Sequence, residues 1–267
     1  MTGKLLPRAN RVRASGGSLV VCVLTPAAAY LAADSRYLNA GAALKDSAEK
    51  LIAVERTALC ALSGYIRFTR TFGTAIDGAE LESTILLSSI VREADRARPN
   101  DGDVDPSAFA ERLFTRLQSI WDAVACDLDQ PFGRGVGSRQ PLAKLLYLDR
   151  RADGEATLLV IELDHAFTRS ENRYTSTLLP MTVRPVYRGM IVSPMAFVIG
   201  AEPGCVVRDP GQIDGEGRAL AFMAELFAAS QHDPGLRARV GGPIDIAVID
   251  AEGRKWLQRK PSRSIAS

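Results

Sequence analysis

The first apolar pattern in the chain is a pair of strand-length runs separated by a single proline. Residues 18–25 are apolar and rich in β-branched side chains, Pro26 interrupts them, and a second apolar run follows at 27–33 and ends at Asp34. Two such runs joined by a tight turn predict a β-hairpin. A turn centred on Pro26 places Ser18 opposite Asp34, within reach of a side-chain contact across an antiparallel pair.

A second hairpin of the same kind is predicted a few residues later. Residues 50–54 and 58–63 are strand-length runs, and the three polar residues at 55–57 form the turn between them. We expect this pairing to place Lys50 opposite Gly64.

The two hairpins together collect a set of chemical groups at strand ends. Ser18 offers a hydroxyl, Asp34 a carboxylate, Lys50 an ammonium and Gly64 a backbone amide. A serine hydroxyl needs a nearby base to become a nucleophile, and an α-amine with a pKa of roughly 7.7 to 8.0 is such a base. Cleavage after Gly17 would make Ser18 an N-terminal residue with its own base. Lys50 would then supply positive charge, Asp34 would hold Lys50, and the Gly64 amide would face an oxyanion.

The remaining pattern predicts further strands and helices around these hairpins. Apolar spacing predicts helices over 80–98, from Asp105-Pro106 to about residue 128, and over 218–230, and strands over 142–148, 157–163, 178–186, 195–201, 243–250 and 255–257. Loops are expected at 165–174 and 204–217, and a β-rich insertion at 65–73. This order predicts an α+β fold, a four-layer αββα sandwich of two antiparallel sheets flanked by helices.

Composition narrows the class of protein. The chain has 267 residues, of which 46% are hydrophobic, enough for one large domain with a full core. Its net charge of +2 gives no reason to expect nucleic acid or an anionic surface as a partner. No apolar run reaches the ~18 residues that a membrane helix needs.

Cysteine and histidine usage bears on location and cofactors. The four cysteines, Cys22, Cys60, Cys126 and Cys205, are widely spaced, which favours reduced core residues and a cytoplasmic location. Only two histidines are present, so a histidine-rich metal site is excluded, and a Ser–His triad would require His165 or His232. We predict no cofactor and no metal.

Four places in the first 64 residues resemble the start of a proteasome β-type subunit, a member of the N-terminal nucleophile hydrolase superfamily. Gly17 and Ser18 stand where that family has Gly-Thr, and Ala-Ala-Asp-Ser-Arg at 32–36 matches a family motif. Lys50 matches the essential lysine, and Gly64, after Ser63, matches the oxyanion glycine. The match covers about 50 residues in one register without a gap. It implies a self-processed peptidase or amide hydrolase, cut between Gly17 and Ser18, with Ser18, Asp34, Lys50 and Gly64 in the catalytic site.

The chain departs from the family at several supporting positions. Serine replaces the usual threonine nucleophile, and Ala201 stands where the family has a serine after a Val-Gly strand end. Arg237 and Val240 occupy the places of an aspartate and a serine ahead of a Gly-Gly pair. Ser230, His232 and Asp233 are alternative sources of those supporting groups.

The N-terminal segment has three interpretations. By the resemblance, residues 1–17 are a removable propeptide before a domain at 18–259 and a disordered tail at 260–267. Its basic residues and the apolar run after them also fit a secretory signal ending at Ala33, in which case the protein is secreted. A leader with no role is the third possibility.

The resemblance also implies partners. We expect a homo-oligomeric ring that takes peptide or amide substrates, with an unfoldase as a possible further partner. The competing function is a catalytically degenerate ring or scaffold subunit, and a more distant one is an amidase acting on a small substrate.

Overall fold

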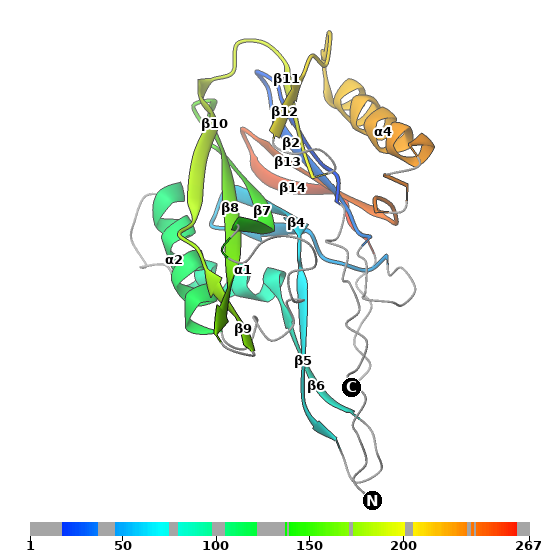
Figure 1. Cartoon of the computed structure of the whole chain (residues 1–267). Coiled ribbons are helices and arrows are strands. Elements are labelled where there is room, and N and C mark those ends of the chain that lie inside the picture. The colour runs from blue at the N-terminus through cyan, green and yellow to red at the C-terminus, as the bar shows by residue number, and fades with distance from the viewer. Residues whose placement is uncertain are drawn as a thin grey trace, which may run out of the picture.

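A computed structural model describes most of the chain and shows a mixed fold dominated by strands (Figure 1). The described residues are 18–36, 46–74, 80–97, 105–121, 137, 139–170, 173–200, 205–233, 236–237 and 239–260. Within them lie two antiparallel sheets of six strands each, a separate two-stranded sheet and three helices. The fold is therefore α+β, as the sequence predicts.

The first sheet is built around the two N-terminal strands. Its strand order is β12 (Cys205–Arg208), β11 (Met195–Ile199), β1 (Val20–Leu24), β2 (Ala29–Asp34), β13 (Ile244–Asp250) and β14 (Gly253–Gln258). Every residue of β1 and β2 is buried, because these strands lie in the middle of the sheet with packed layers on both faces. Their uninterrupted apolar sequence is what such burial requires.

The second sheet contains the hairpin that begins after Lys50 and the pair of long strands β7 (Arg139–Arg150) and β8 (Glu155–Ser170). Its order is β10 (Thr182–Met190), β8, β7, β4 (Ala58–Gly64) and β3 (Leu51–Val54), with β9 (Arg173–Leu178) paired to β8. β10 lies at the edge of the sheet, where its Pro185 interrupts the pairing at a register shift.

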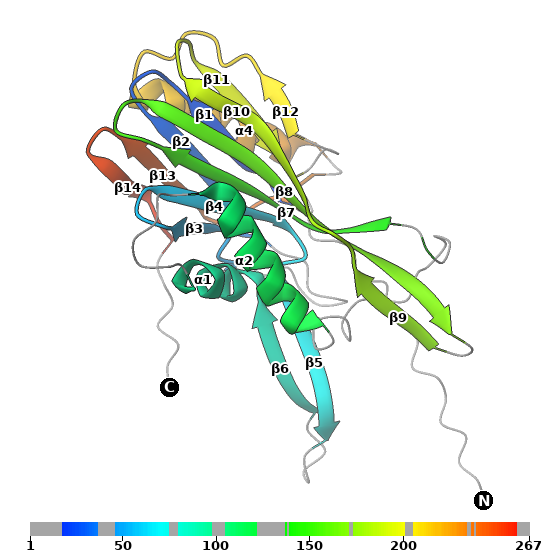
Figure 2. The ribbon, with the colours of Figure 1, turned by 90° about the vertical axis from the view of Figure 1, so that its left-hand side faces the viewer.

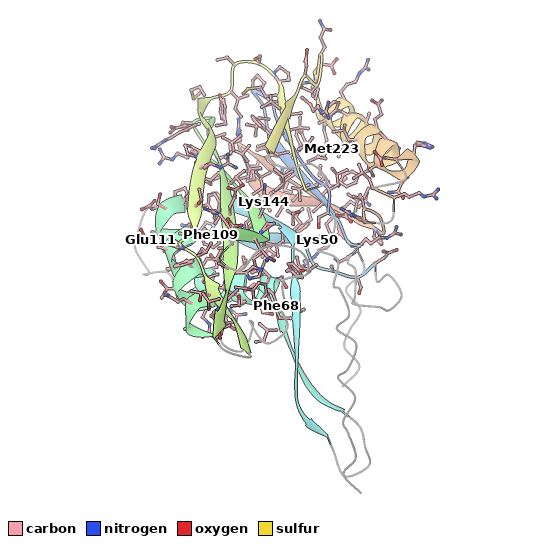
Figure 3. The ribbon with its side chains drawn as sticks, in the orientation of Figure 1. Lys50, Phe68, Phe109, Glu111, Lys144 and Met223 are labelled. Atoms are coloured by element: carbon pink, nitrogen blue, oxygen red, sulfur yellow. The ribbon has the colours of Figure 1, made fainter. Side chains whose placement is uncertain are left out.

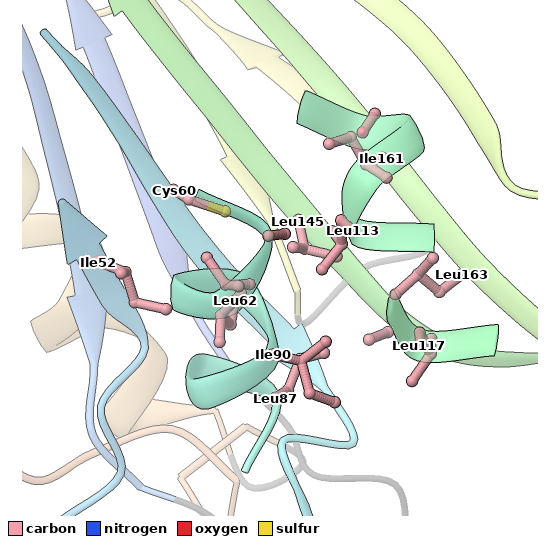
Figure 4. Packing of buried hydrophobic residues seen from close by; sticks show 14 of the residues in the cluster. Ile52, Cys60, Leu62, Leu87, Ile90, Leu113, Leu117, Leu145, Ile161 and Leu163 are labelled. Carbon is pink, nitrogen blue, oxygen red and sulfur yellow. The ribbon is translucent and has the colours of Figure 1, made fainter. Parts of the chain in front are cut away.

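Three hydrophobic clusters connect the sheets and helices. One cluster packs α1 (Leu87–Arg96) and α2 (Pro106–Ser119) against the second sheet (Figure 4). Another fills the space between the two sheets, and the third packs α4 (Glu216–His232) on the first sheet. Figures 1 and 2 show α4 on one side of the molecule and α1 with α2 on the other. The start of α2 is as predicted: Pro106 is its first residue, and Asp105 caps it by accepting from the Ser107 amide at 2.9 Å.

The predicted helix over 80–98 is wrong in its first part. Residues Glu80–Leu86 form a strand, β6, which pairs with β5 (Arg67–Thr74), and the helix begins only at Leu87. The hairpin of β5 and β6 extends away from the body of the molecule (Figure 2). The β-rich segment after Gly64 therefore pairs with Glu80–Leu86, although the periodicity of those residues alone predicts the first turns of a helix.

The N-terminal hairpin has a register one residue away from the predicted one. Its turn consists of two residues, Pro26 and Ala27, closed by a 2.8 Å bond from the Thr25 amide to the Ala28 carbonyl. This two-residue turn pairs Val20 with Ala33. A turn centred on Pro26 alone would shift every pair by one residue.

As a consequence, the residue across from Asp34 is Leu19, not Ser18. The Asp34 amide donates to the Leu19 carbonyl at 3.2 Å. Ser18 is therefore one position further from Asp34 along the ladder than predicted.

The second hairpin is shifted by two residues. Val54 pairs with Ala58 around a three-residue turn, and the Leu62 amide donates to the Lys50 carbonyl at 2.8 Å. Lys50 is thus across from Leu62 and not from Gly64. Because side chains alternate with a period of two, this shift leaves Lys50 on the predicted face.

Two predicted loops contain strands. β8 continues to Ser170 and β9 follows it, where the polar composition of 165–174 predicts a loop. His165, Ala166 and Phe167 are all buried, and this stretch pairs with β9, so burial and strand pairing outweigh the polarity of the segment. Similarly, β12 lies within the predicted loop at 204–217.

Candidate functional site

The centre of the candidate site is the Asp34 carboxylate at the end of β2. Its Oδ1 accepts from the Leu19 amide at 3.0 Å and from Lys50 Nζ at 2.9 Å. Its Oδ2 accepts from the Arg36 amide at 3.2 Å and from the Gly241 amide at 3.1 Å. Four N–H donors therefore fix both oxygens of a carboxylate that is 1% exposed.

Lys50 lies immediately before β3 with its whole side chain in the interior (Figure 3). Its Nζ donates to Asp34 Oδ1 and to the carbonyl oxygen of Arg36. Burial lowers the pKa of Lys50, and the negative charge of Asp34 partly opposes that shift. Burial likewise raises the pKa of Asp34, against the effect of Lys50. Deprotonation of this ammonium is therefore easier than deprotonation of a solvated lysine.

Ser18 lies beside this ion pair, two residues before β1. Its side chain is buried, and its Oγ has no hydrogen-bond partner among the described residues. The next residue, Leu19, donates its amide to the oxygen of Asp34 that also binds Lys50. A buried hydroxyl without a partner lowers the stability of the fold by on the order of 1–3 kcal/mol. A catalytic role is one reason for a protein to keep such a group.

Gly200, the residue after β11, lies between Ser18 and the end of β4. A Cβ added at Gly200 would lie 1.9 Å from the Ser18 carbonyl oxygen and 3.2 Å from Ser63 Oγ. Ser18 and Ser63 therefore lie close together, although Ser18 leads into the first sheet and Ser63 lies in the second. Gly64, the residue after Ser63, has φ +102° and approaches β7 so closely that a Cβ would lie 2.7 Å from the Leu142 carbonyl oxygen.

Arg36 fixes the remaining side of the site. Its guanidinium forms a two-point ion pair with Asp46, with distances of 2.8 and 3.1 Å. Its Nη1 donates to the carbonyl oxygens of Arg237 at 2.8 Å and Val240 at 3.3 Å. The same guanidinium covers Gly241, where a Cβ would lie 2.6 Å from Arg36 Cζ. The Arg36 side chain therefore holds the backbone of the segment that precedes Gly241.

The structure brings together Ser18, Asp34 and Lys50. Gly64 follows Ser63, which lies close to Ser18. Gly17 and Ala201 lie outside the described residues. The alternative supporting groups have other contacts: Ser230 Oγ donates to the Phe227 carbonyl of its own helix, Asp233 Oδ1 accepts from the Leu236 amide, and His232 is exposed at the end of α4. His165 is bound to Ser176, with Nδ1 and Oγ 3.0 Å apart.

Two contributors were not assigned from the sequence. The carbonyl of Arg36 accepts from Lys50, and the amide of Gly241 donates to Asp34. Both belong to motifs visible in the sequence, the 32–36 stretch and the Gly-Gly pair. Their roles involve backbone atoms, so side-chain chemistry gave no signal for them.

Neither protein-family models nor curated proteins give a match to this chain. Within the described ranges, no group of three or more His, Cys, Asp or Glu side chains is placed to hold a metal ion. Nor does any helix there have the length and hydropathy to cross a membrane.

Proposed function

We propose that this chain is a proteasome-like N-terminal nucleophile hydrolase with Ser18 as its nucleophile. The observation that carries the proposal is the buried Ser18 hydroxyl, which has no hydrogen-bond partner among the described residues and lies one residue from an amide that shares an Asp34 oxygen with Lys50. The arrangement of two sheets with helices on their outer sides supports interpreting the fold as a four-layer αββα sandwich.

The first reaction is maturation of the chain itself. Ser18 Oγ attacks the Gly17 carbonyl carbon while its proton passes to Lys50 Nζ in the neutral form, which burial makes accessible. The Gly17–Ser18 C–N bond breaks, the departing nitrogen takes that proton from the Lys50 ammonium, and an ester to Ser18 Oγ forms. Water then hydrolyses this ester, which gives the Gly17 carboxylate and a free Ser18 amine.

The second reaction is hydrolysis of a peptide or amide. The Ser18 amine takes the hydroxyl proton as Oγ attacks the substrate carbonyl, and Lys50 stabilises the negative charge that develops. Asp34 keeps Lys50 in place. The Gly64 amide is proposed to donate to the oxyanion.

The N-terminal strands argue against removal of residues 1–33 as a secretory signal. β1 and most of β2 lie within those residues, at the centre of the first sheet and packed in two hydrophobic clusters. Their loss would expose β11 and β13 and remove a large part of the core.

A catalytically degenerate ring or scaffold subunit is the second candidate. It is favoured by Arg237 and Val240, whose backbone carbonyls accept from Arg36 Nη1. Nothing in that pair resembles an acid and a hydroxyl directed at Ser18.

Intact-mass measurement of the purified full-length chain distinguishes the two candidates. An active subunit loses residues 1–17, and Ser18→Ala retains them. The matched control is Ser119→Ala, a serine at the end of α2 that forms hydrogen bonds with Arg116; this variant should be cut as in the wild type. Retention of residues 1–17 by the wild-type protein would overturn the hydrolase proposal and support the degenerate subunit. Native mass spectrometry of the same sample tests the proposed homo-oligomeric ring.

A further inference from the structure

Lys260, at the end of the described C-terminal segment, makes three contacts with the rest of the molecule. Its backbone amide donates to Asp245 Oδ1 at 2.8 Å, and its Nζ lies 3.4 Å from Asp245 Oδ2. Its Nζ also donates to the carbonyl oxygen of Ala48. The disordered tail predicted from residue 260 therefore begins with a residue that is bound, while 261–267 lie outside the described residues.

The contact with Ala48 places Lys260 on the segment that carries Lys50. Residues 46–50 precede β3 and are held at one end by the ion pair of Asp46 with Arg36. Lys260 holds the middle of the same segment, at Ala48, two residues before Lys50. Asp245, which binds Lys260, lies on β13 across from Ala33, the residue before Asp34. Lys260 thus connects the strand beside Asp34 to the segment of Lys50.

We propose that Lys260 is a positioning residue for Lys50: it holds the 46–50 segment against β13 and places a second positive charge beside the Asp34–Lys50 pair. The relevance of this inference to catalysis rests on the proposed function, but the effect of Lys260 on Lys50 can be measured without any activity.

The charges around Lys50 determine the sign of the effect. Asp34 on β2 and Asp46 on its own segment favour the ammonium form, whereas Lys260 and burial disfavour it and lower the pKa of Lys50. Asp245 on β13 forms an ion pair with Lys260. Because Lys260 is 16% exposed at its side chain, its charge is only partly screened by solvent. Removing this charge should therefore make Lys50 harder to deprotonate.

The test measures the titration of Lys50 directly. The chain has six lysines, so ¹³Cε-lysine labelling of full-length Ser18→Ala protein gives few signals, and Lys50→Arg assigns the one of interest. We expect Lys260→Met to raise the apparent pKa of Lys50 by on the order of half a unit. Lys260→Arg, which keeps the charge, should restore most of the wild-type value.

A matched control lies on β14, the strand that precedes Lys260. Lys255 on β14 pairs with Asp250 on β13 at 3.2 Å, much as Lys260 pairs with Asp245, but its partners are Asp250 and Glu252 in the distal turn. Lys255→Met should leave the Lys50 titration unchanged. Equal Lys50 titration in Lys260→Met and Lys255→Met would overturn the proposal.

The labelled protein needs no activity, so the two proposals fail separately. If the wild-type chain keeps residues 1–17 but Lys260→Met shifts Lys50, only the hydrolase proposal fails. If the wild-type chain is cut and its pH profile is the same in Lys260→Met, the role of Lys260 fails. Lys260→Gln serves as a second variant if Lys260→Met does not fold.

Discussion

Lys50 Nζ and Asp34 Oδ1 lie 2.9 Å apart in a site where both side chains are at most 1% exposed to solvent. Burying two charges costs desolvation free energy, and in a pair of this kind their mutual attraction and additional hydrogen bonds offset much of that cost. Its members are therefore strongly interdependent.

Removal of either partner should destabilise the fold. Asp34→Asn leaves a buried ammonium and Lys50→Met leaves a buried carboxylate, so each should lower the free energy of unfolding by about 3–5 kcal/mol. The double variant should cost less than the sum of the two, since it leaves no unpaired charge. Urea unfolding of the three variants measures this, and strictly additive costs would show that the two groups do not interact.

The glycine that separates Ser18 from Ser63 gives a second prediction. Gly200→Ala places a Cβ 1.9 Å from the Ser18 carbonyl oxygen at φ +120°, so β1 or β11 must move. We expect a loss of about 3 kcal/mol or more, from both overlap and backbone strain.

Gly189 provides the matched control for that substitution. It has φ +138°, a comparably restricted backbone, but nothing lies within 4 Å of an added Cβ. Gly189→Ala should therefore cost only the strain, on the order of 1 kcal/mol. Thermal unfolding compares the two, and similar losses would mean that the close approach to Ser18 is not the cause.

His165 predicts a loss of stability in acid. Burial lowers its pKa from 6.5 to about 4, so between these values the unfolded chain binds a proton that the folded chain does not. The contribution of His165 is complete above pH 6.5 and decreases as the pH falls towards 4. At pH 5 the loss is about 2 kcal/mol relative to pH 7.

Substitution of each histidine separates this effect from other acid effects. His165→Gln should reduce the difference in free energy of unfolding between pH 7 and pH 5, measured by urea titration. His232, the only other histidine, is exposed at the end of α4, and His232→Gln should leave the difference as it is. An unchanged difference in His165→Gln would mean that His165 does not couple to folding in this range.

Local sequence predicted the elements whose pattern agrees with their surroundings. The apolar runs at β1 and β2, the Asp105-Pro106 start of α2 and the closing hairpin of β13 and β14 are all where the pattern places them. The prediction failed at β6 and at the end of β8, because pairing with another strand supplied hydrogen bonds that periodicity alone does not reveal.

The candidate site was predicted in part for the same reason. Asp34 and Lys50 form the expected pair, but the residues assigned as opposite them, Ser18 and Gly64, are displaced by one and two positions. Register depends on how many residues each turn uses, and a proline alone does not fix that number.

The sequence by itself determined that this chain has two adjacent apolar hairpins, with a hydroxyl, a carboxylate and an amine spaced along them, because burial in a sheet requires such runs and their polar ends stand out. The tertiary structure alone decided what surrounds these groups. Gly200, Gly241, Arg36 and Lys260 come from four separate segments, and backbone amides, carbonyls and a distant ammonium set the environment of Lys50. Contacts of this kind depend on how strands from distant parts of the chain are ordered in a sheet, and no local pattern encodes that order.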